Sequence, residues 1–322
     1  MKKSNNPLLY PLSWLYGLGV GLRNFLFNQG ILKQQAYPIP LICVGNITVG
    51  GTGKTPHVEL LISILRKQYR IAVISRGYKR KSRGLREVTL TSTAEEVGDE
   101  PKQIKQKYPE VRFIVDGNRR RAMRYLLALP EEERPEVVLL DDGFQHRYVQ
   151  PSFSILLIDA QRELHDDELL PLGGLREPAT ARYRADCIIL TKCPHDMPPI
   201  KLRIMQRNLD LYAHQKIFFS RIHYQQPRAV RTLFGEAGSP LPKDALVIAL
   251  SGIASPGLFF SYLDERYELI DQLVYPDHHQ FRRKDFTAIS VRWQELCEQH
   301  SGRPVYIVCT EKDAVRFTDS LG

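Results

Sequence analysis

The chain has 322 residues, 43% of them hydrophobic, and this composition excludes an intrinsically disordered protein. Its five cysteines include no CxxC pair, which argues against a zinc site and predicts reduced thiols in a cytosolic protein. The formal charge of +9 predicts an anionic partner, which nucleic acid, an acidic lipid surface or a phosphorylated substrate could each supply.

Residues 1–35 predict a helix with an unusual distribution of side chains. No charged residue lies between Lys3 and Arg23. On a helix, one narrow polar face would carry Ser13, Gly17, Gly21, Asn24 and Asn28, with leucine and phenylalanine over the rest. Prolines and glycines make the segment marginal as a spanning helix. We expect it to lie in a membrane interface, where Trp14 and Tyr16 suit the headgroup depth. The alternative is a helix that packs on the protein's own core.

A glycine-rich loop follows the apolar run of residues 40–44 and precedes a helix-compatible run from His57 to Arg66. Strand, glycine loop, Lys-Thr and helix form the layout of a phosphate-binding P-loop. Glycines let backbone N–H groups turn toward a phosphate, and the helix N-terminus adds its dipole. Lys54 can reach the β- and γ-phosphates, and the Thr55 hydroxyl can bind Mg²⁺. The predicted nucleotide-binding residues are Thr48, Val49, Gly50, Gly51, Thr52, Gly53, Lys54 and Thr55. Thr48 departs from the usual pattern, which has glycine there, and the alternative is a glycine-rich turn without a ligand.

Short apolar runs alternate with helical stretches along the rest of the chain. This pattern predicts an α/β fold of the P-loop NTPase type, with a mostly parallel sheet and helices on both faces. The expected strands are 41–44, 71–75, 112–115, 137–140, 155–158, 187–191, 216–221, 246–250 and 305–309. We expect an N-terminal helix within residues 1–35, a nucleotide-binding core over 36–224, a linker or β-ribbon over 225–243, and a smaller C-terminal α/β domain over 244–322.

Residues at the ends of two predicted strands bear on metal binding and on the choice of nucleotide. Asp141 and Asp142 follow an apolar strand, where P-loop proteins present an acidic residue to Mg²⁺, and either could be the ligand. A turn is the alternative. Thr191-Lys192 ends another strand where GTPases often carry Asn/Thr-Lys-x-Asp, but Pro194 occupies the fourth position and favours ATP over GTP.

Three weaker signals remain. The turn Gly98-Asp99-Glu100 could be no more than a surface turn, and Asp277-His278-His279 could be structural or could draw a proton from a hydroxyl. Basic residues cluster over 76–86 and 119–124, either as solvated surface or as contacts for phosphates. Because aromatic residues are not interleaved with them in the RNP manner, a nucleic-acid partner is disfavoured.

Several specific motifs occur in one order along most of the chain. They are Gly45-Asn46-Ile47-Thr48-Val49-Gly50-Gly51-Thr52-Gly53-Lys54-Thr55-Pro56, Ser75-Arg76-Gly77-Tyr78, Gly98-Asp99-Glu100-Pro101, Leu140-Asp141-Asp142-Gly143-Phe144-Gln145-His146, Leu170-Pro171-Leu172-Gly173-Gly174-Leu175-Arg176-Glu177-Pro178, Ser251-Gly252-Ile253-Ala254, Asp277-His278 and Thr310-Glu311-Lys312-Asp313-Ala314-Val315. With these motifs the chain resembles the tetraacyldisaccharide 4'-kinases of lipid A synthesis. Thr48 is shared by that family.

The resemblance implies phosphorylation, with ATP and Mg²⁺, of the 4'-hydroxyl of a lipid-linked glucosamine disaccharide 1-phosphate, forming lipid IVA. It implies a peripheral enzyme at the cytoplasmic face of a Gram-negative inner membrane, with no nucleic-acid partner and no obligate protein partner. The implied catalytic residues are Asp99 as base, a histidine partner for it, with His278 favoured over His279, and Lys54. The implied metal and active-site acid set is Thr55, Glu100, Asp141 and Asp142. The implied substrate contacts are Arg76, Tyr78, His146 and Arg176.

Because Asp99 and His278 fall in different predicted domains, we expect closure between the domains to assemble the pair. Two rival functions remain. One is a P-loop ATPase that acts as a switch or transport motor, and the other is a nucleic-acid-stimulated ATPase.

Overall fold

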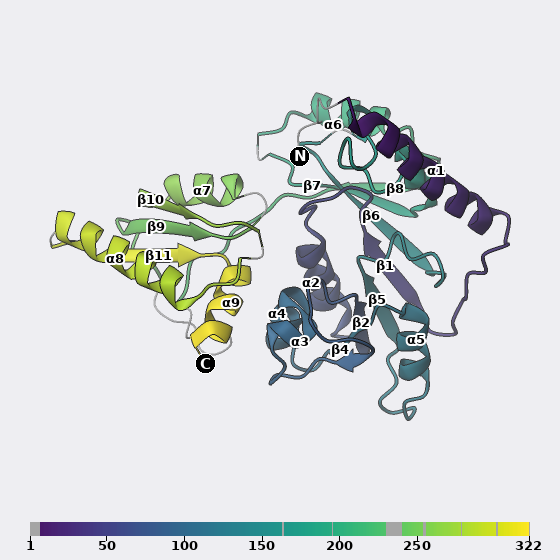
Figure 1. Ribbon diagram of the computed structural model, residues 1–322, viewed down its shortest axis with the longest axis horizontal. Helices are drawn as coiled ribbons and strands as arrows, with labels where there is room; N and C mark the ends of the chain where they lie inside the picture. Colours follow the sequence, from purple (N-terminus) through teal and green to yellow (C-terminus); the bar gives the residue numbers. More distant parts are fainter. Residues whose placement is uncertain are drawn as a thin grey trace. The chain divides into compact units, whose positions relative to one another are not determined.

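The computed structural model describes residues 7–162, 164–194, 196–229, 240–253, 256–277, 279–300 and 302–321. Its larger sheet has eight strands in the order β3-β4-β2-β5-β1-β6-β7-β8, all parallel except for the β3–β4 pair (Figure 1). The strands are β1 (Leu41–Gly45), β2 (Ile71–Ser75), β3 (Arg86–Glu87), β4 (Arg112–Val115), β5 (Val137–Asp141), β6 (Phe153–Asp159), β7 (Cys187–Thr191) and β8 (Lys216–Phe219). The prediction of a mostly parallel α/β sheet is confirmed. Strand β3, only two residues long, was not predicted.

Helices cover both faces of this sheet (Figure 1). On one face, Val138 and Leu140 of β5 pack with Met123 and Leu126 of α5 (Arg119–Leu127). On the other, α2 (Lys54–Leu65) contacts β1 and β5 and buries Val58 and Ile62. Beyond β6 lie α6 (Pro199–Asn208) and the 3₁₀ helices η1 (Leu164–Asp166) and η2 (Ala179–Arg184). Both faces of the central strands are thus buried, which explains their continuous apolar runs.

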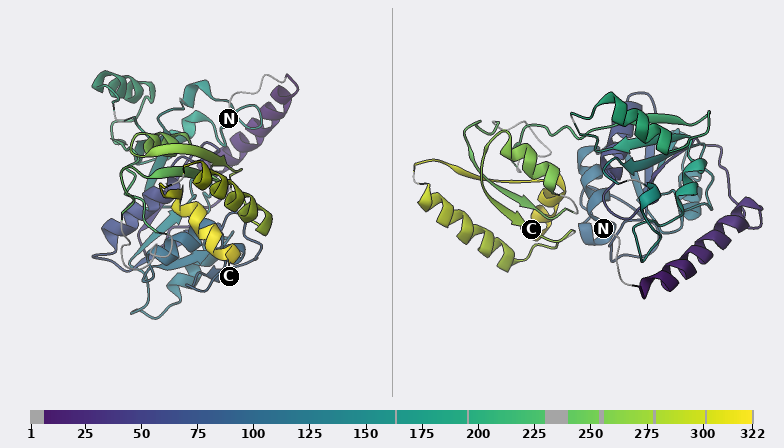
Figure 2. Two further views of the ribbon diagram at one scale, coloured as in Figure 1. Left: turned by 90° about the vertical axis from the view of Figure 1, so that its left-hand side faces the viewer. Right: turned by 90° about the horizontal axis from the view of Figure 1, so that it is seen from above.

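Helix α1 (Leu9–Asn28) lies along the outside of the large sheet and its helices (Figures 1 and 2). Its polar stripe faces the protein: Ser13 Oγ donates to Leu169 O at 2.8 Å, and Asn24 Nδ2 donates to Glu177 Oε2 at 3.0 Å. The leucine-rich remainder of the helix is exposed, whereas Phe27 is buried. Among the residues with described positions, no helix is both long and apolar enough to cross a bilayer.

A second, three-stranded parallel sheet has β9 (Leu246–Ser251) between β10 (Glu268–Val274) and β11 (Val305–Cys309). Alternate residues of β9 point to opposite faces. Val247 packs with Leu263 of α7 (Gly257–Asp264), and Ile248 packs with Leu296 of α8 (Arg283–Gln299). Strand β10 was not predicted, because its acidic and amide residues interrupt the apolar run and most of it is only partly buried.

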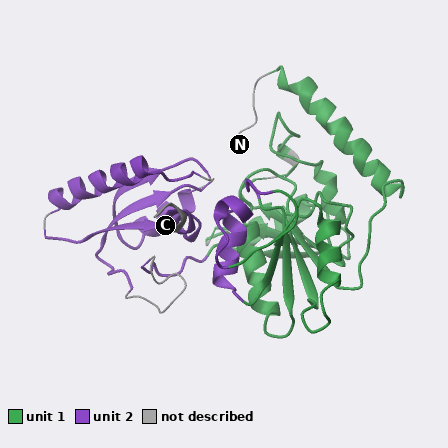
Figure 3. Cartoon of the chain, turned by 60° about the horizontal axis from the view of Figure 1, so that its bottom comes forward, with its two compact units in different colours: residues 1–77, 83–89, 110–222 green, residues 78–82, 90–109, 223–322 purple. Residues whose placement is uncertain are grey.

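The chain divides into two compact units (Figure 3). Unit 1 is residues 1–77, 83–89 and 110–222, and unit 2 is residues 78–82, 90–109 and 223–322. The predicted core over 36–224 included residues 78–82 and 90–109, which cluster instead with the C-terminal sheet. The physical reason is that α4 (Asp99–Lys107), which follows α3 (Ala94–Val97), packs against α9 (Glu311–Leu321), a contact too remote in sequence for local patterns to predict.

Candidate active site

The glycine-rich loop connects β1 to α2 in unit 1 and has the backbone that its sequence predicts. Gly50 and Gly53 have φ angles of +103° and +85°, in the region that glycine adopts without strain, and Gly53 caps α2, which begins at Lys54. A Cβ added at Gly51 would meet no atom within 4 Å, so the loop borders open space. Backbone N–H groups, open space and a helix N-terminus fit a polyphosphate.

Asn46 links the end of β1 to the loop. The residue is fully buried, and its Nδ2 donates to Thr52 Oγ1 at 2.9 Å. Lys54 Nζ donates to Asn46 Oδ1 at 3.5 Å, so one side chain braces both the loop and its lysine. On the far side, Thr191 Oγ1 of β7 donates to Thr52 O at 3.0 Å. Sequence reasoning gave Asn46 no role, although it stands at the strand–loop junction within a quoted motif.

Asp142 lies between Lys54 of the loop and Arg176, which is distant from both in the sequence. Its Oδ1 lies 3.7 Å from Lys54 Nζ, and its Oδ2 accepts from Arg176 at 3.2 Å. Its backbone is left-handed, with φ of 48°. Burial raises the pKa of Asp142, but the charges of Lys54 and Arg176 outweigh burial, so this pKa lies below its usual value. Asp142 is therefore ionised at neutral pH.

Asp141 differs from its neighbour in environment. It ends β5, is buried, and accepts a hydrogen bond from Ser75 Oγ at 3.0 Å through Oδ2. The Asp142 side chain is 31% exposed. Carboxylate and hydroxyl oxygens of Asp141, Asp142 and Thr55 are the donor types that Mg²⁺ prefers, and they fit this ion. Within the part of the chain with described positions, no three His, Cys, Asp or Glu side chains form a ready cation cluster.

The Leu170–Pro178 motif, which contains the Leu-Arg-Glu-Pro segment (residues 175–178), supports the loop from outside. Val49 N donates to Gly174 O at 2.7 Å, and Arg176 N donates to Ile47 O at 2.7 Å. Arg162 donates to Val49 O at 2.8 Å and pairs with Asp167 at 2.6 Å. The predicted substrate residue Arg176 thus also supports the loop.

His146 is held neutral near the end of β5. Burial, then the charges of Arg119, Arg23 and other arginines, lowers its pKa to about 4. Its Nε2 is buried without a hydrogen bond to any residue of described position. Arg119, which was predicted only as part of a basic cluster, is buried at the start of α5. Predicted substrate residue Arg76 is exposed after β2 and also depresses this pKa.

Unit 2 contains the other predicted acids. Asp99 and Glu100 open α4, where Arg316 Nε donates to Asp99 Oδ2 at 2.8 Å. Lys312 Nζ lies 3.3 Å from Glu100 Oε1 and 3.6 Å from Asp277 Oδ1. Asp99 and Asp277 belong to one unit, whereas the predicted domain boundaries placed these two residues in different domains.

The other predicted site residues of unit 2 differ in their partners and exposure. His278 lies outside the residues whose positions are described. His279 Nε2 lies 3.2 Å from Asp285 Oδ2. Tyr78 is 62% exposed. Unit 1 thus brings Lys54, Asp142 and Arg176 together, while unit 2 holds Asp99 and Glu100.

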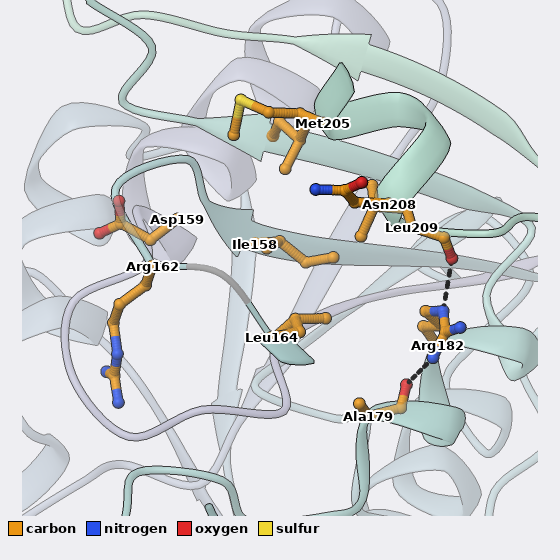
Figure 4. Close-up of a pocket in the computed structure, with 10 residues that line it drawn as sticks. Ile158, Asp159, Arg162, Leu164, Ala179, Arg182, Met205, Asn208 and Leu209 are labelled. Carbon is orange, nitrogen blue, oxygen red and sulfur yellow. Dashed lines mark hydrogen bonds between the residues drawn. The ribbon is translucent and has the colours of Figure 1, made fainter. Parts of the chain in front are cut away.

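A separate pocket lies in unit 1 between β6, β7, η2 and α6 (Figure 4). Ile158, Leu164, Leu190 and Met205 line its apolar wall, with Asp159, Arg162, Arg182 and Asn208 among the polar lining residues. Its arginines and aspartate are engaged in the fold: Arg182 donates to Leu209 O, and Asp159 pairs with Lys192 at 2.7 Å. Its lining residue Arg162 also donates to Val49 O of the glycine-rich loop.

The chain is similar over most of its length to proteins of one family. The family model for tetraacyldisaccharide-1-P 4'-kinase matches residues 5–321. A tetraacyldisaccharide 4'-kinase of Porphyromonas gingivalis is 51% identical over 312 residues, 97% of this chain and 86% of the relative. One from Parabacteroides distasonis is 46% identical over 321 residues, 98% and 85% of the two chains.

A solved structure is also similar to this chain over most of its length. The LpxK protein of Aquifex aeolicus, crystallised in complex with ATP, is 28% identical with a TM-score of 0.70, and the match covers 95% of this chain and 88% of that one. The P-loop NTPase-type fold predicted from the sequence is confirmed. On these matches, the chain belongs to the tetraacyldisaccharide 4'-kinase family.

Proposed function

We propose that this chain transfers the γ-phosphoryl group of ATP to the 4'-hydroxyl of a tetraacyl glucosamine disaccharide 1-phosphate, forming lipid IVA in lipid A biosynthesis. The observation that carries the proposal is the contact of Asp142 with both Lys54 of the loop and Arg176 of the Leu-Arg-Glu-Pro segment, in a chain of this family. Phosphoryl transfer depends on positioning and charge neutralisation, and these two cations supply positive charge beside the phosphate loop.

The loop residues Thr48 to Thr55 would hold the triphosphate through backbone N–H groups, with Lys54 at its β- and γ-phosphates. Bound Mg²⁺ would neutralise phosphate charge, held by Thr55 with Asp141 or Asp142, and Glu100 is proposed to complete the active-site acids. Asp99 would accept the proton of the attacking hydroxyl, with His278 as its partner. Arg76, Tyr78, His146 and Arg176 would contact the disaccharide or its phosphate.

Helix α1 is proposed to dock on an acidic lipid surface at the cytoplasmic face of a Gram-negative inner membrane. The polar stripe of α1 bonds to the protein through Ser13 and Asn24, which turns the leucine-rich side outward. The charge of +9 adds attraction to anionic headgroups. A substrate with four acyl chains would be presented at such a surface.

The test is transfer of label from [γ-³²P]ATP to purified tetraacyl disaccharide 1-phosphate, with a 4'-O-methyl analogue as the matched acceptor. We expect label on the free 4'-hydroxyl compound, none on the methylated one, and loss of transfer in Asp99→Ala with ATP binding retained. ATP turnover that ignores the disaccharide would support a switch or motor ATPase, and turnover stimulated by DNA or RNA would support the nucleic-acid rival. Equal transfer by Asp99→Ala would refute the assignment of the base alone.

A further inference from the structure

Two motifs of the chain have no role in the scheme above, and both converge on one buried arginine. Arg316 lies on α9, directly after the Thr310–Val315 motif, and is only 5% exposed. It donates to Gly252 O, of the Ser251–Ala254 motif, at 3.0 Å, and to Asp313 Oδ1 at 3.0 Å. Its Nε donates to Asp99 Oδ2 at 2.8 Å. All of these contacts lie within unit 2.

The frame that orients Arg316 is itself well ordered by hydrogen bonds. Asp313 is fully buried, and its Oδ2 accepts from Gly252 N at 3.1 Å and from Thr310 Oγ1 at 2.7 Å. Gly252 leaves little room beside it, because a Cβ there would lie 3.0 Å from Asp313 Oδ1. Because Nη1 of Arg316 donates to both Gly252 O and Asp313 Oδ1, the planar guanidinium is fixed and presents its Nε side in one direction. That side meets Asp99.

Several charges surround Asp99. Its helix carries Lys102, whose pKa burial lowers and the charge of Asp99 raises. From α9, Arg316 bonds to it directly, and Asp313 lies behind that arginine. Lys312 is engaged with Glu100 and Asp277. Arg316 contacts the Asp99 carboxylate directly, with Nε 2.8 Å from Oδ2.

We propose that Arg316 is the positioning residue of Asp99: its guanidinium holds one carboxylate oxygen in place, so that the carboxylate keeps a fixed orientation toward the hydroxyl that it deprotonates. The proposal rests on the role of Asp99 proposed above. A base must be held to within a fraction of an ångström, and a misplacement of about 1 Å can cost on the order of 100-fold in rate.

A purely structural role is the competing explanation, since Arg316 also joins α9 to α4. The chain offers a matched control for this role. Lys107 of α4 lies 3.3 Å from Glu311 of α9, an ion pair between the same two helices that leaves both side chains more than a third exposed. Removing that pair weakens the helix contact without touching the carboxylate of Asp99.

The experiment compares Arg316→Gln, Arg316→Lys and Lys107→Met in the full-length protein, by label transfer to the disaccharide and by thermal melting. We expect kcat to fall about 10- to 100-fold in Arg316→Gln with KM for ATP unchanged, partial recovery in Arg316→Lys, and near wild-type kcat in Lys107→Met. The acid limb of kcat should move to higher pH in Arg316→Gln, because losing an adjacent cation raises the pKa of a carboxyl group. If Arg316→Gln does not fold, Arg316→Lys, which retains the charge but not the fork geometry, carries the comparison.

Repeating the change at Arg316 in an Asp99→Asn protein distinguishes positioning of Asp99 from a purely structural role. In Asp99→Asn, adding Arg316→Gln should cause no further loss of kcat if the arginine acts through Asp99. An equal loss in both backgrounds, or a lower melting temperature with wild-type kcat, would overturn the positioning role. Full transfer by Asp99→Asn alone would refute both the role of Asp99 as the base and the role of Arg316 in positioning it. Absence of label transfer by the wild type would instead refute the proposed function.

Discussion

The exposed side of α1 gives a measurable prediction for membrane docking. Leu15 and Leu22 are 57% and 61% exposed and face away from the polar seam of the helix. Complete burial of a leucine side chain is worth about 1.5–3 kcal/mol, so a little over half of that, about 0.9–1.8 kcal/mol, remains for each to gain in a lipid interface. Changing both to serine should therefore cost about 1.8–3.5 kcal/mol, or roughly 20- to 400-fold in vesicle affinity.

The assay is co-sedimentation with vesicles of phosphatidylethanolamine and phosphatidylglycerol over a range of lipid concentrations. The matched control is Leu60→Ser with Ile64→Ser on α2, where two apolar residues are 53% and 57% exposed. We expect the control to bind as the wild type does, and both double variants to melt within about 1 °C of it, since none of the four side chains is buried. Equal vesicle binding by all three proteins would refute docking through α1.

Three further changes test the loop site. Thr52→Val removes the hydroxyl that accepts from the buried Asn46 amide, which should cost about 1–3 kcal/mol of stability. The melting temperature should therefore fall by several degrees. An unchanged melting temperature would contradict the stabilising role of the Asn46–Thr52 hydrogen bond. Asp142→Asn should lower kcat about 100-fold in the label-transfer assay, because Lys54 and Arg176 lose their shared anion, and a value within threefold of wild type would exclude that role. His146 has a folded pKa of about 4 against an ordinary 6.5, so only the unfolded chain binds its proton between these values. Stability should therefore fall as pH drops from 6.5 to 4, and melting curves of His146→Gln should show a smaller fall, whereas identical curves would contradict the burial of a neutral imidazole.

The local features of the site were predictable because they depend on neighbours in the sequence. Glycine at positions 50 and 53 permits the positive φ angles that the loop adopts, and Lys54 begins α2 as the strand–loop–helix order implies. The central strands were predicted as continuous apolar runs because both of their faces are buried. Strand β10 escaped prediction, since its partly exposed, mixed sequence lacks that signature.

The orientation of α1 was predictable only in part from the sequence. Its polar stripe was predictable from helical spacing, but which side would meet the protein was not. In the structure Ser13 and Asn24 find backbone and carboxylate partners in the segment around residues 169–177, so the polar side is the inner one. Gly21, predicted on the same stripe, is exposed with no atom within 4 Å of its added Cβ.

The chain's residue pattern alone determined a phosphate loop, a parallel sheet and an acidic strand end at Asp141 and Asp142, because each arises from residues close together in sequence. Only the tertiary structure decided that Asp142 meets both Lys54 and Arg176, and that Asp99 meets Arg316 of α9. These contacts depend on the order of strands in the sheet and on the packing of α4 against α9, and no local periodicity encodes either.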